Sequence, residues 1–428
     1  MRYWKKDGIL NMNDLASLRL CSGFCQMVGA AAAILSINNS VVIFNGPRWC
    51  ALTAERELTI ANITYAKRLF CTEARQETLV YGVEGALKET LDEVAIAVEK
   101  PEVTAIMTSC SMSLIGDDIG GIAHTHGNFN ALLTIESGGL TGTFSNGYTM
   151  AFLELLKALD LVQKQKCDKV NLIGVCTCHP HWQGNTEELV RILKLAGIEV
   201  NVILGSDGTS LEDIKNMTSA ALNIVLDKDL GLSIAQYLKD NYQQQYIVAE
   251  WPFGFKATSR WLENICRTLN IIDGCKKIEH EIMLIQDNLV EYCSWVEHNI
   301  HDYFLEKAVI SMPGNTGKAF TDALMDSNIN LFLCNDIVVE RFTNNIEKYK
   351  HKSLSESLDC KEGVILLAAS DRERVLFRNS RRIIYLDFGM PQARCCGNWI
   401  CYVGVRGWQN FVSEFTNQLI GLYLMPQK

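Results

Sequence analysis

The stretch "VTAIMTSCSMSLIGDDI" (residues 103–119) joins an apolar run, Val103 to Met107, to a segment that begins like a helix. A short unbroken apolar run followed by a helix is typical of a parallel strand buried on both faces. Cys110 stands at this junction. In open α/β sheets, ligands gather beyond the carboxyl ends of the strands. The stretch therefore predicts an α/β fold and makes Cys110 a candidate site residue.

The same alternation of apolar runs and helical segments continues along most of the chain. The run "SVVIF" (40–44) precedes "GPRWC", and "KVNLIGV" (169–175) precedes a loop and the helix-like "TEELVRILKLAG" (186–197), which Gly197 is expected to end. Alternating strands and helices predict the α/β fold class, here as three Rossmann-like doubly wound domains with mostly parallel sheets. Further strand-like runs lie at 198–204, 245–250, 307–312, 329–334, 363–369 and 381–389.

A chain of 428 residues is too long for one compact core, which favours several domains. We expect an N-terminal α/β domain with the candidate cysteines at 1–165, a middle α/β domain at 166–306, and a third α/β domain at 307–428 whose C-terminal segment packs back on the others. The stretch 273–306 contains no proline and one early glycine. It is predicted to form a long connector helix that ends the middle domain.

Charge and hydropathy argue against two classes of partner. A net charge of -9 gives no basic footprint, so nucleic acid is not an expected partner. Residues 20–47 carry no charge, but their most apolar run, 27–37, falls well short of the ~20 residues of a spanning helix. Asp7 and Asp14 precede that run and fit a signal peptide poorly. We expect a cytoplasmic protein without membrane association.

The cysteines are the most informative side chains. Sixteen of them in a chain without an export signal favour metal or redox chemistry over disulfides. Cys50 and Cys110 each follow a predicted strand, and Cys25 opens a small-residue helix whose dipole lowers the cost of a thiolate. Thiolates that converge from separate loops suit an iron-sulfur cluster. Free cysteines are also commonly buried as small apolar side chains, and spacing alone leaves both explanations open.

Four motifs carry a family resemblance. They are "CQMVGAAAAIL" (25–35), "FNGPRWC" (44–50), "ETLVYGVEGAL" (77–87) and "TSCSMSLIGDDI" (108–119). In this order and approximate spacing they resemble the nitrogenase component 1 family, especially its β-type subunits. Weaker similarity extends the resemblance over nearly the whole chain, through "GGLTGTFSNGY" (138–148), "WPFGFKATSRWLENI" (251–265) and "DFGMPQARCCGNWICYVGVRGWQNF" (387–411).

The resemblance implies a cofactor and partners. Three cysteines per subunit of that family bind an iron-sulfur cluster at a subunit interface, which implies Cys25, Cys50 and Cys110 as the ligands here. The cluster would be either a P-cluster completed by the partner's cysteines or a 4Fe-4S cluster with its fourth ligand from the other chain. The implied partners are a homologous α-type subunit, in a heterotetramer or else a homodimer, and a separate ATP-dependent iron-sulfur reductase protein.

Two departures from the family pattern bear on the role of the chain. The catalytic α-type subunit holds its metal cofactor with a further cysteine in the middle domain and a histidine near the C-terminus. Here the corresponding positions offer Leu226 and Asp227, and "ARCCGNW" (393–399) contains no histidine. The resemblance therefore implies a β-like, electron-relaying subunit of a nitrogenase-like oxidoreductase, with no catalytic residue assigned. A scaffold for nitrogenase cofactor assembly and a subunit of a tetrapyrrole reductase are the alternatives, and the substrate stays open.

Three other segments contain residues that suggest a site. The segment "CTCHPHW" (176–182) brings Cys176, Cys178, His179 and His181 together, but its spacing matches no standard zinc module, so a polar loop is the preferred interpretation. A second hypothesis assigns Cys395, Cys396 and Cys401 to the substrate side, by position alone. The segment "PGNTGKAF" (313–320) lacks the spacing of a phosphate-binding loop, which fits a division of labour with a separate ATPase.

Overall fold

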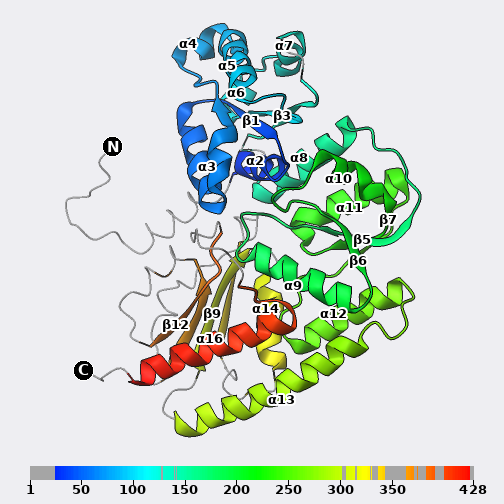
Figure 1. Cartoon of the computed structure of the whole chain (residues 1–428). Helices are drawn as coiled ribbons and strands as arrows, with labels where there is room; N and C mark the ends of the chain where they lie inside the picture. Colours follow the sequence, from blue (N-terminus) through cyan, green and yellow to red (C-terminus); the bar gives the residue numbers. More distant parts are fainter. Residues whose placement is uncertain are drawn as a thin grey trace, which may run out of the picture.

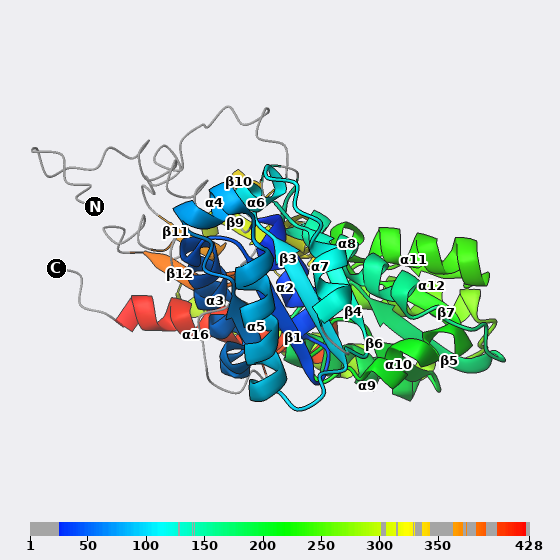
Figure 2. The ribbon, with the colours of Figure 1, turned by 90° about the horizontal axis from the view of Figure 1, so that it is seen from above.

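A computed structural model describes residues 25–126, 129–138, 140, 142–300, 305–313, 316–327, 329, 336–342, 363–370, 374, 382–390 and 400–424. Three α/β units follow one another along the chain (Figure 1). The N-terminal unit lies at the top of this view, the middle unit at the right and the third unit at the lower left. From above, the N-terminal and middle units lie side by side (Figure 2).

Each unit is built on a four-stranded sheet, and the paired strands run parallel. The strand orders are β2-β1-β3-β4, β6-β5-β7-β8 and β10-β9-β11-β12, so the three units share one topology. This confirms the predicted fold class. The strands are β1 (Ser40–Asn45), β2 (Leu69–Cys71), β3 (Val103–Thr108), β4 (Leu132–Glu136), β5 (Cys167–Ile173), β6 (Glu199–Ile203), β7 (Ala220–Val225), β8 (Tyr246–Val248), β9 (Leu305–Pro313), β10 (Asp336–Phe342), β11 (Val364–Ala369) and β12 (Ile383–Asp387).

This topology places a crevice at the carboxyl edge of each sheet. The chain leaves the first strand of each unit on one side and returns on the other, so the crossovers diverge at a switch point. The switch points lie between β1 and β3, between β5 and β7, and between β9 and β11. Side chains that follow these strands are the ones that can share a site.

The N-terminal sheet is buried on both faces. Val42 and Phe44 of β1 belong to a core shared with the middle unit, and Val41 and Ile43 belong to a core on the opposite face. This explains the unbroken apolar runs of β1 and β3. The helices of the unit are α2 (Gln26–Leu35), α3 (Arg48–Ala61), η1 (Ile63–Arg68), α4 (Gln76–Tyr81), α5 (Glu84–Ala97), α6 (Cys110–Ser113), α7 (Ile119–His126) and α8 (Phe144–Ala158).

The uncharged stretch near the N-terminus forms helix α2. All ten of its residues are buried, because it packs against α8 and the sheet and has no solvent face. No helix in the described part of the chain is both long enough and apolar enough to cross a bilayer.

The middle unit contains the helix that the sequence predicts at 186–197. Helix α9 begins earlier, at Trp182, and ends at Leu195, and Gly197 follows with φ of +81°. This left-handed conformation favours glycine and ends the helix as expected. The helices of the unit are α9 (Trp182–Leu195), α10 (Leu211–Asn216), η2 (Met217–Ser219), α11 (Lys228–Tyr242), α12 (Phe255–Thr268) and α13 (Lys276–Asn299).

The predicted connector helix at 273–306 is only partly correct. Helix α13 begins at Lys276 and ends at Asn299, and β9 begins at Leu305, where it pairs with Val364. Sheet pairing therefore overrides the helical pattern in the last residues of the predicted helix. The third unit adds α14 (Thr316–Asp326) and the C-terminal α16 (Gly404–Leu424), which packs against α9, α12 and α13 of the middle unit.

Four strands were not predicted from the sequence: β2, β4, β7 and β10. Of these, β2 has only three residues, too few for a periodic signal. The predicted strand at 329–334 lies outside the described residues except for Ile329. The domain boundaries near 165 and 306 stay predictions.

Candidate functional site

Two of the candidate cysteines lie at the switch point of the N-terminal sheet. Cys50 is in the first turn of α3, which follows β1, and Cys110 is the first residue of α6, which follows β3. Since β1 and β3 are neighbours in the sheet, their carboxyl ends meet at one edge. Both side chains are half-buried, in keeping with the crevice position expected from the topology.

Cys25 reaches the same edge from a helix outside the sheet. It caps the N-terminus of α2 and forms an isolated bridge with Thr143, the cap of α8. Two glycines hold these helices in backbone contact. A Cβ on Gly29 would lie 1.9 Å from the carbonyl oxygen of Phe144, and one on Gly147 would lie 1.8 Å from that of Gln26. The position of Cys25 therefore depends on this helix pair.

Gly46 brings the ends of β1 and β3 together. A Cβ there would lie 2.3 Å from the Ser109 Oγ, so only glycine lets the residue before Cys110 approach this closely. Gly138, just after β4, lies beside Cys110, but a Cβ on it would lie 3.4 Å from the Cys110 Cα, an ordinary contact distance. The close approach of the β1 and β3 ends therefore depends on Gly46.

The thiols of Cys25, Cys50 and Cys110 are close enough to influence one another's ionisation. Burial raises the pKa of Cys25, the N–H groups of Val28 and Met27 oppose this, and a charge on Cys110 would raise it further. Burial also raises the pKa of Cys50, and charges on Cys25 and Cys110 add to the effect. The start of α2 therefore lowers the pKa of Cys25, as the sequence predicts, but burial raises this pKa by more. Assembling three anions here requires a positively charged group between them.

The donor set fits an iron-sulfur cluster chemically. Soft sulfur donors come from three separate elements, and N–H groups at the start of α2 face one of the sulfurs, an arrangement that stabilises cluster thiolates. Among the described residues, no group of three or more His, Cys, Asp or Glu side chains is arranged to hold a single metal ion. The three cysteines are thus neighbours and not a preformed single-ion site.

Exposed apolar side chains accompany the candidate cysteines in sequence. Trp49, next to Cys50, is 79% exposed, and Leu114, just after α6, is 81% exposed. Leu140, which follows Gly138, is 78% exposed. Large exposed apolar side chains beside a candidate site are typical of a surface that contacts another protein.

The segment 176–182 is not the polar loop that the sequence favours. It follows β5 at the switch point of the middle sheet, and Cys176, Cys178, His179 and His181 are all buried there. The loop lies against the other units: Tyr65 donates a hydrogen bond to Thr177 Oγ1 at 3.1 Å, and His181 Nε2 donates to the Asp387 carbonyl at 2.7 Å. Contacts between the units therefore bury a loop whose residue types suggest exposure to solvent.

Two ionisable side chains of this loop, Cys178 and His179, are held uncharged. Burial lowers the pKa of His179 to about 4. The Cys178 thiol has a pKa well above its usual value, because it is hydrogen-bonded to Cys176 and fully buried. Neutral, buried side chains of this kind suit packing between the units.

The position where the sequence lacks the family's middle-domain cysteine is part of a helix start. Leu226 is fully buried, and Asp227 caps α11 by accepting hydrogen bonds from the N–H groups of Asp229 and Leu230. Burial raises the pKa of Asp227 to about 7, with the charge of Asp229 adding to the effect. The middle switch point thus holds a helix cap at this position.

Replacing Asp227 with asparagine is expected to stabilise the fold at high pH. Because the folded state raises this pKa, the native chain binds the proton more tightly than the unfolded chain, and its stability falls as pH rises from about 4 to about 7. Asparagine keeps the cap without the charge. The gain should reach at most about 4 kcal/mol at pH 8 and shrink toward pH 5.

Urea unfolding of both proteins at pH 5 and pH 8 measures this difference. Asp240→Asn, an exposed substitution on the same helix, is the control and should change stability by no more than about 0.5 kcal/mol. A gain for Asp227→Asn that is equal at both pH values would contradict the assignment.

The hypothesis that assigns Cys395, Cys396 and Cys401 to the substrate side can be compared with the structure only at Cys401. Cys401 is buried beside the start of α16, and burial raises its pKa to about 11. A Cβ on Gly184 of α9 would lie 3.1 Å from the Cys401 backbone nitrogen, so this cysteine joins the third unit to the middle one. Cys395 and Cys396 lie outside the described residues, and their assignment to the substrate side stays a prediction.

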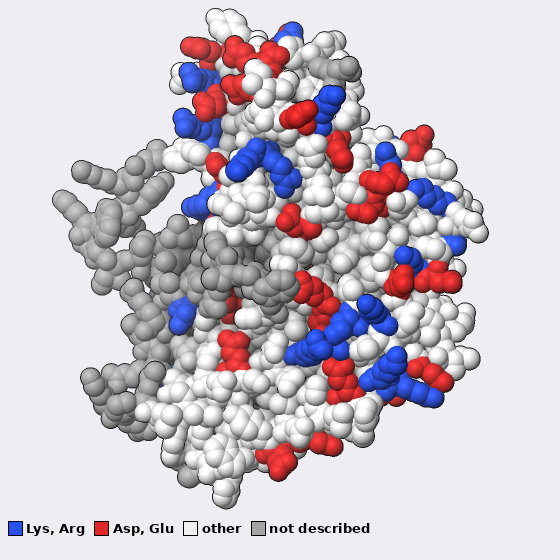
Figure 3. Space-filling model, in the orientation of Figure 1, with Lys and Arg blue, Asp and Glu red and all other residues white. Residues whose placement is uncertain are grey.

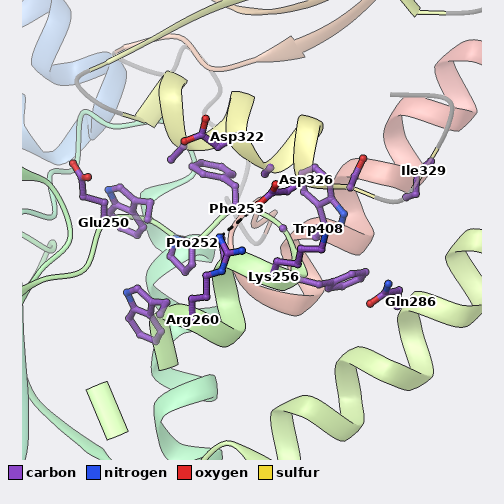
Figure 4. A pocket seen from close by; sticks show the side chains of 18 of the residues that line it. Glu250, Pro252, Phe253, Lys256, Arg260, Gln286, Asp322, Asp326, Ile329 and Trp408 are labelled. Carbon is purple, nitrogen blue, oxygen red and sulfur yellow. Dashed lines mark ion pairs between the residues drawn. The ribbon is translucent and has the colours of Figure 1, made fainter. Parts of the chain in front are cut away.

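A cavity of about 330 Å³ lies between the middle and third units (Figure 4). Aromatic side chains, including Trp251, Phe253 and Trp408, form much of its wall, and an Arg260–Asp326 ion pair of 3.6 Å spans its rim. None of the three candidate cysteines lines it.

On the face drawn in Figure 3, Lys and Arg side chains alternate with Asp and Glu.

Sequence analysis missed one half-buried cysteine at the carboxyl edge of the N-terminal sheet. Cys71 is the last residue of β2, beside β1. Burial raises its pKa, and a charge on Cys50 would add to the effect. Its position at the end of a strand could have marked it as a candidate site residue, but this strand has only three residues and was not predicted.

Comparison with curated proteins identifies several relatives of the chain. The "Nitrogenase iron-iron protein beta chain" of Rhodobacter capsulatus is 22% identical over 56% of this chain and 57% of the relative. The relative from Crocosphaera subtropica, a light-independent protochlorophyllide reductase subunit, is 24% identical over 76% and 62%. The "Nitrogenase iron-molybdenum cofactor biosynthesis protein NifE" of Clostridium pasteurianum is 25% identical over 62% and 60%. The chain spans about three fifths of the length of these relatives.

The fold comparison and the family comparison agree. The structure titled "Nitrogenase Cp1 at pH 6.5" superposes with a TM-score of 0.70 at 17% identity, over 94% of this chain and 93% of that one, which shows a common fold. The family model described as "Nitrogenase component 1 type Oxidoreductase" matches residues 25–330, which is more than half of the chain. These matches confirm the resemblance, and the chain belongs to the nitrogenase component 1 type oxidoreductase family.

Proposed function

We propose that the chain is a β-like subunit of a nitrogenase-type reductase, located in the cytoplasm. Cys25, Cys50 and Cys110 would hold an iron-sulfur cluster, of the 4Fe-4S or P-cluster type, at a subunit interface. Such a cluster supplies one-electron transfer. The observation that carries the proposal is that three half-buried thiols from separate elements meet at the switch point of the first sheet.

The chain's own residues would position the cluster and tune it. The glycine contacts of α2 and α8 hold Cys25 in place, and Gly46 lets β3 deliver Cys110 to the same edge. N–H groups that face the Cys25 sulfur favour its thiolate, and partial burial limits the access of water to the three thiols, so both act on the reduction potential.

The proposed partner at this edge is a homologous α-type subunit, in a heterotetramer. The exposed apolar side chains Trp49, Leu114 and Leu140 support a protein contact beside the cysteines. Half-buried thiols would become fully enclosed when a partner covers them. The electrons would come from a separate ATP-dependent iron-sulfur reductase protein and pass to a reduction site.

Anaerobic electron transfer tests the proposal. The chain is purified with the subunit that co-purifies, and its electron paramagnetic resonance spectrum is followed after adding the reductase protein with or without ATP. We expect reduction of the cluster only when both the reductase protein and ATP are present. A cluster that does not respond to them, in a protein that instead passes a bound metal precursor to an acceptor, would replace the proposal with the assembly-scaffold function.

A tetrapyrrole reductase subunit is the second candidate. The alignment with the protochlorophyllide reductase relative covers 76% of this chain, compared with 56% for the iron-iron β chain and 62% for NifE. Addition of protochlorophyllide to the same assay distinguishes this candidate, because its reduction changes the absorption spectrum of the pigment.

A further inference from the structure

Cys71 lies at the same sheet edge as the three candidate ligands. It ends β2, its Cα pairs with that of Phe44 in β1, and its Sγ donates a hydrogen bond of 3.5 Å to the Gly46 carbonyl oxygen. Because parallel strands end at a common edge, β1, β2 and β3 all deliver a cysteine there or just beyond it. Cys71 is thus the outermost of these three strand-end thiols.

Gly46 links Cys71 to the other cysteines. Its carbonyl oxygen accepts the bond from Cys71, and its missing side chain is what lets Ser109, the residue before Cys110, come close. Cys50 follows four residues later, in the first turn of α3. One glycine therefore has direct contact with Cys71 and Ser109 and lies just before Cys50.

Burial raises the pKa of the Cys71 thiol, and the charges of Glu73 and Cys50 add to this effect, while two neighbouring groups oppose it. The N–H of Glu73 donates to Sγ at 3.3 Å, and the charge of Arg48 also favours the ionised form. Glu73 has φ of +49°, a left-handed conformation that costs energy for a residue other than glycine. Strain of this kind is concentrated at ligand-binding sites, and here it accompanies an N–H that points at sulfur.

We propose that Cys71 supplies a fourth thiolate to the cluster, so that a single chain carries a complete set of four cysteine ligands. The inference rests on the proposed function of Cys25, Cys50 and Cys110. Four thiolates are the usual ligand set of a 4Fe-4S cluster. On binding, the Cys71 thiol loses its proton to solvent and gives up its bond to Gly46, while the bond from Glu73 remains. The ligand set would then not depend on a cysteine from the partner.

Single substitutions at Cys71 test the inference in the anaerobically purified full chain with its co-purifying subunit. Cys71→Ala should lower bound iron by about a quarter or more, and the oxidised protein should show the paramagnetic signal of a three-iron cluster. Cys71→Ser keeps both hydrogen bonds to the backbone but offers oxygen to iron. It should lose iron or shift the spectrum and reduction potential of the cluster, which a merely structural thiol would not do.

Cys167→Ala is the matched control, since Cys167 is also half-buried but begins β5 in another sheet. It should leave iron and spectrum unchanged. If Cys71→Ser has the iron content, spectrum and potential of the unsubstituted protein while Cys25→Ala loses the cluster, the inference is wrong and the proposed function stands. If Cys25→Ala also retains the cluster, the proposed function itself fails.

Discussion

Single replacement of Cys25, Cys50 or Cys110 with alanine is expected to lower bound iron at least about tenfold, because each thiol reaches the site from a different element. Loss of any one would release the cluster from one of the three elements, α2, α3 and α6, that hold it. Iron and sulfide analysis of the anaerobically purified proteins measures the effect.

The fold of these variants should be preserved, because each side chain is only half-buried and small. Cys167→Ala provides the comparison, as its Sγ lies 3.7 Å from Ser219 Oγ in the middle unit. Unfolding midpoints near that of the unsubstituted chain would show that iron loss is local. A Cys50→Ala protein with full iron and sulfide content would remove Cys50 from the ligand set.

Replacing Gly147 with alanine should disturb both the fold and the site. The new Cβ would lie 1.8 Å from the carbonyl oxygen of Gln26, so α2 and α8 must separate. Contacts with backbone cannot be relieved by a side-chain rotation, and we expect a loss of about 3 kcal/mol or more in the free energy of unfolding. Cys25 caps α2, so bound iron should fall as well.

Gly85→Ala is the control for the Gly147 variant. Gly85 lies in α5, and a Cβ there would meet no atom within 4 Å. This substitution should leave iron unchanged and stabilise the chain by up to about 1 kcal/mol, as alanine favours helix over glycine. Urea unfolding and iron analysis check both variants, and equal behaviour of the two would show that the α2–α8 contact is not close.

Strand ends could be predicted where the strand itself has a strong pattern. The runs 40–44 and 103–109 are apolar because both faces of the sheet are covered, and that burial made Cys50 and Cys110 visible as strand-end residues. Cys71 has the same position on the sheet edge but follows a strand of three residues. Its neighbourhood is set by pairing with β1, a long-range contact that local sequence does not encode.

Contacts between the units account for two further errors. The composition of segment 176–182 predicts a polar loop. In the structure, hydrogen bonds join it to Tyr65 of the N-terminal unit and Asp387 of the third unit, and these contacts exclude water. The predicted helix at 273–306 ends early because Leu305 joins the third sheet. In both places, residues distant in sequence decide the structure.

Differential alkylation followed by mass spectrometry tests the central claim most directly, since it reads each thiol in the unsubstituted protein. The account predicts that Cys25, Cys50 and Cys110 are protected in the anaerobic, iron-loaded protein and become reactive after the iron is chelated, while Cys167 reacts equally in both states. Equal labelling of the three cysteines before and after iron removal would contradict it.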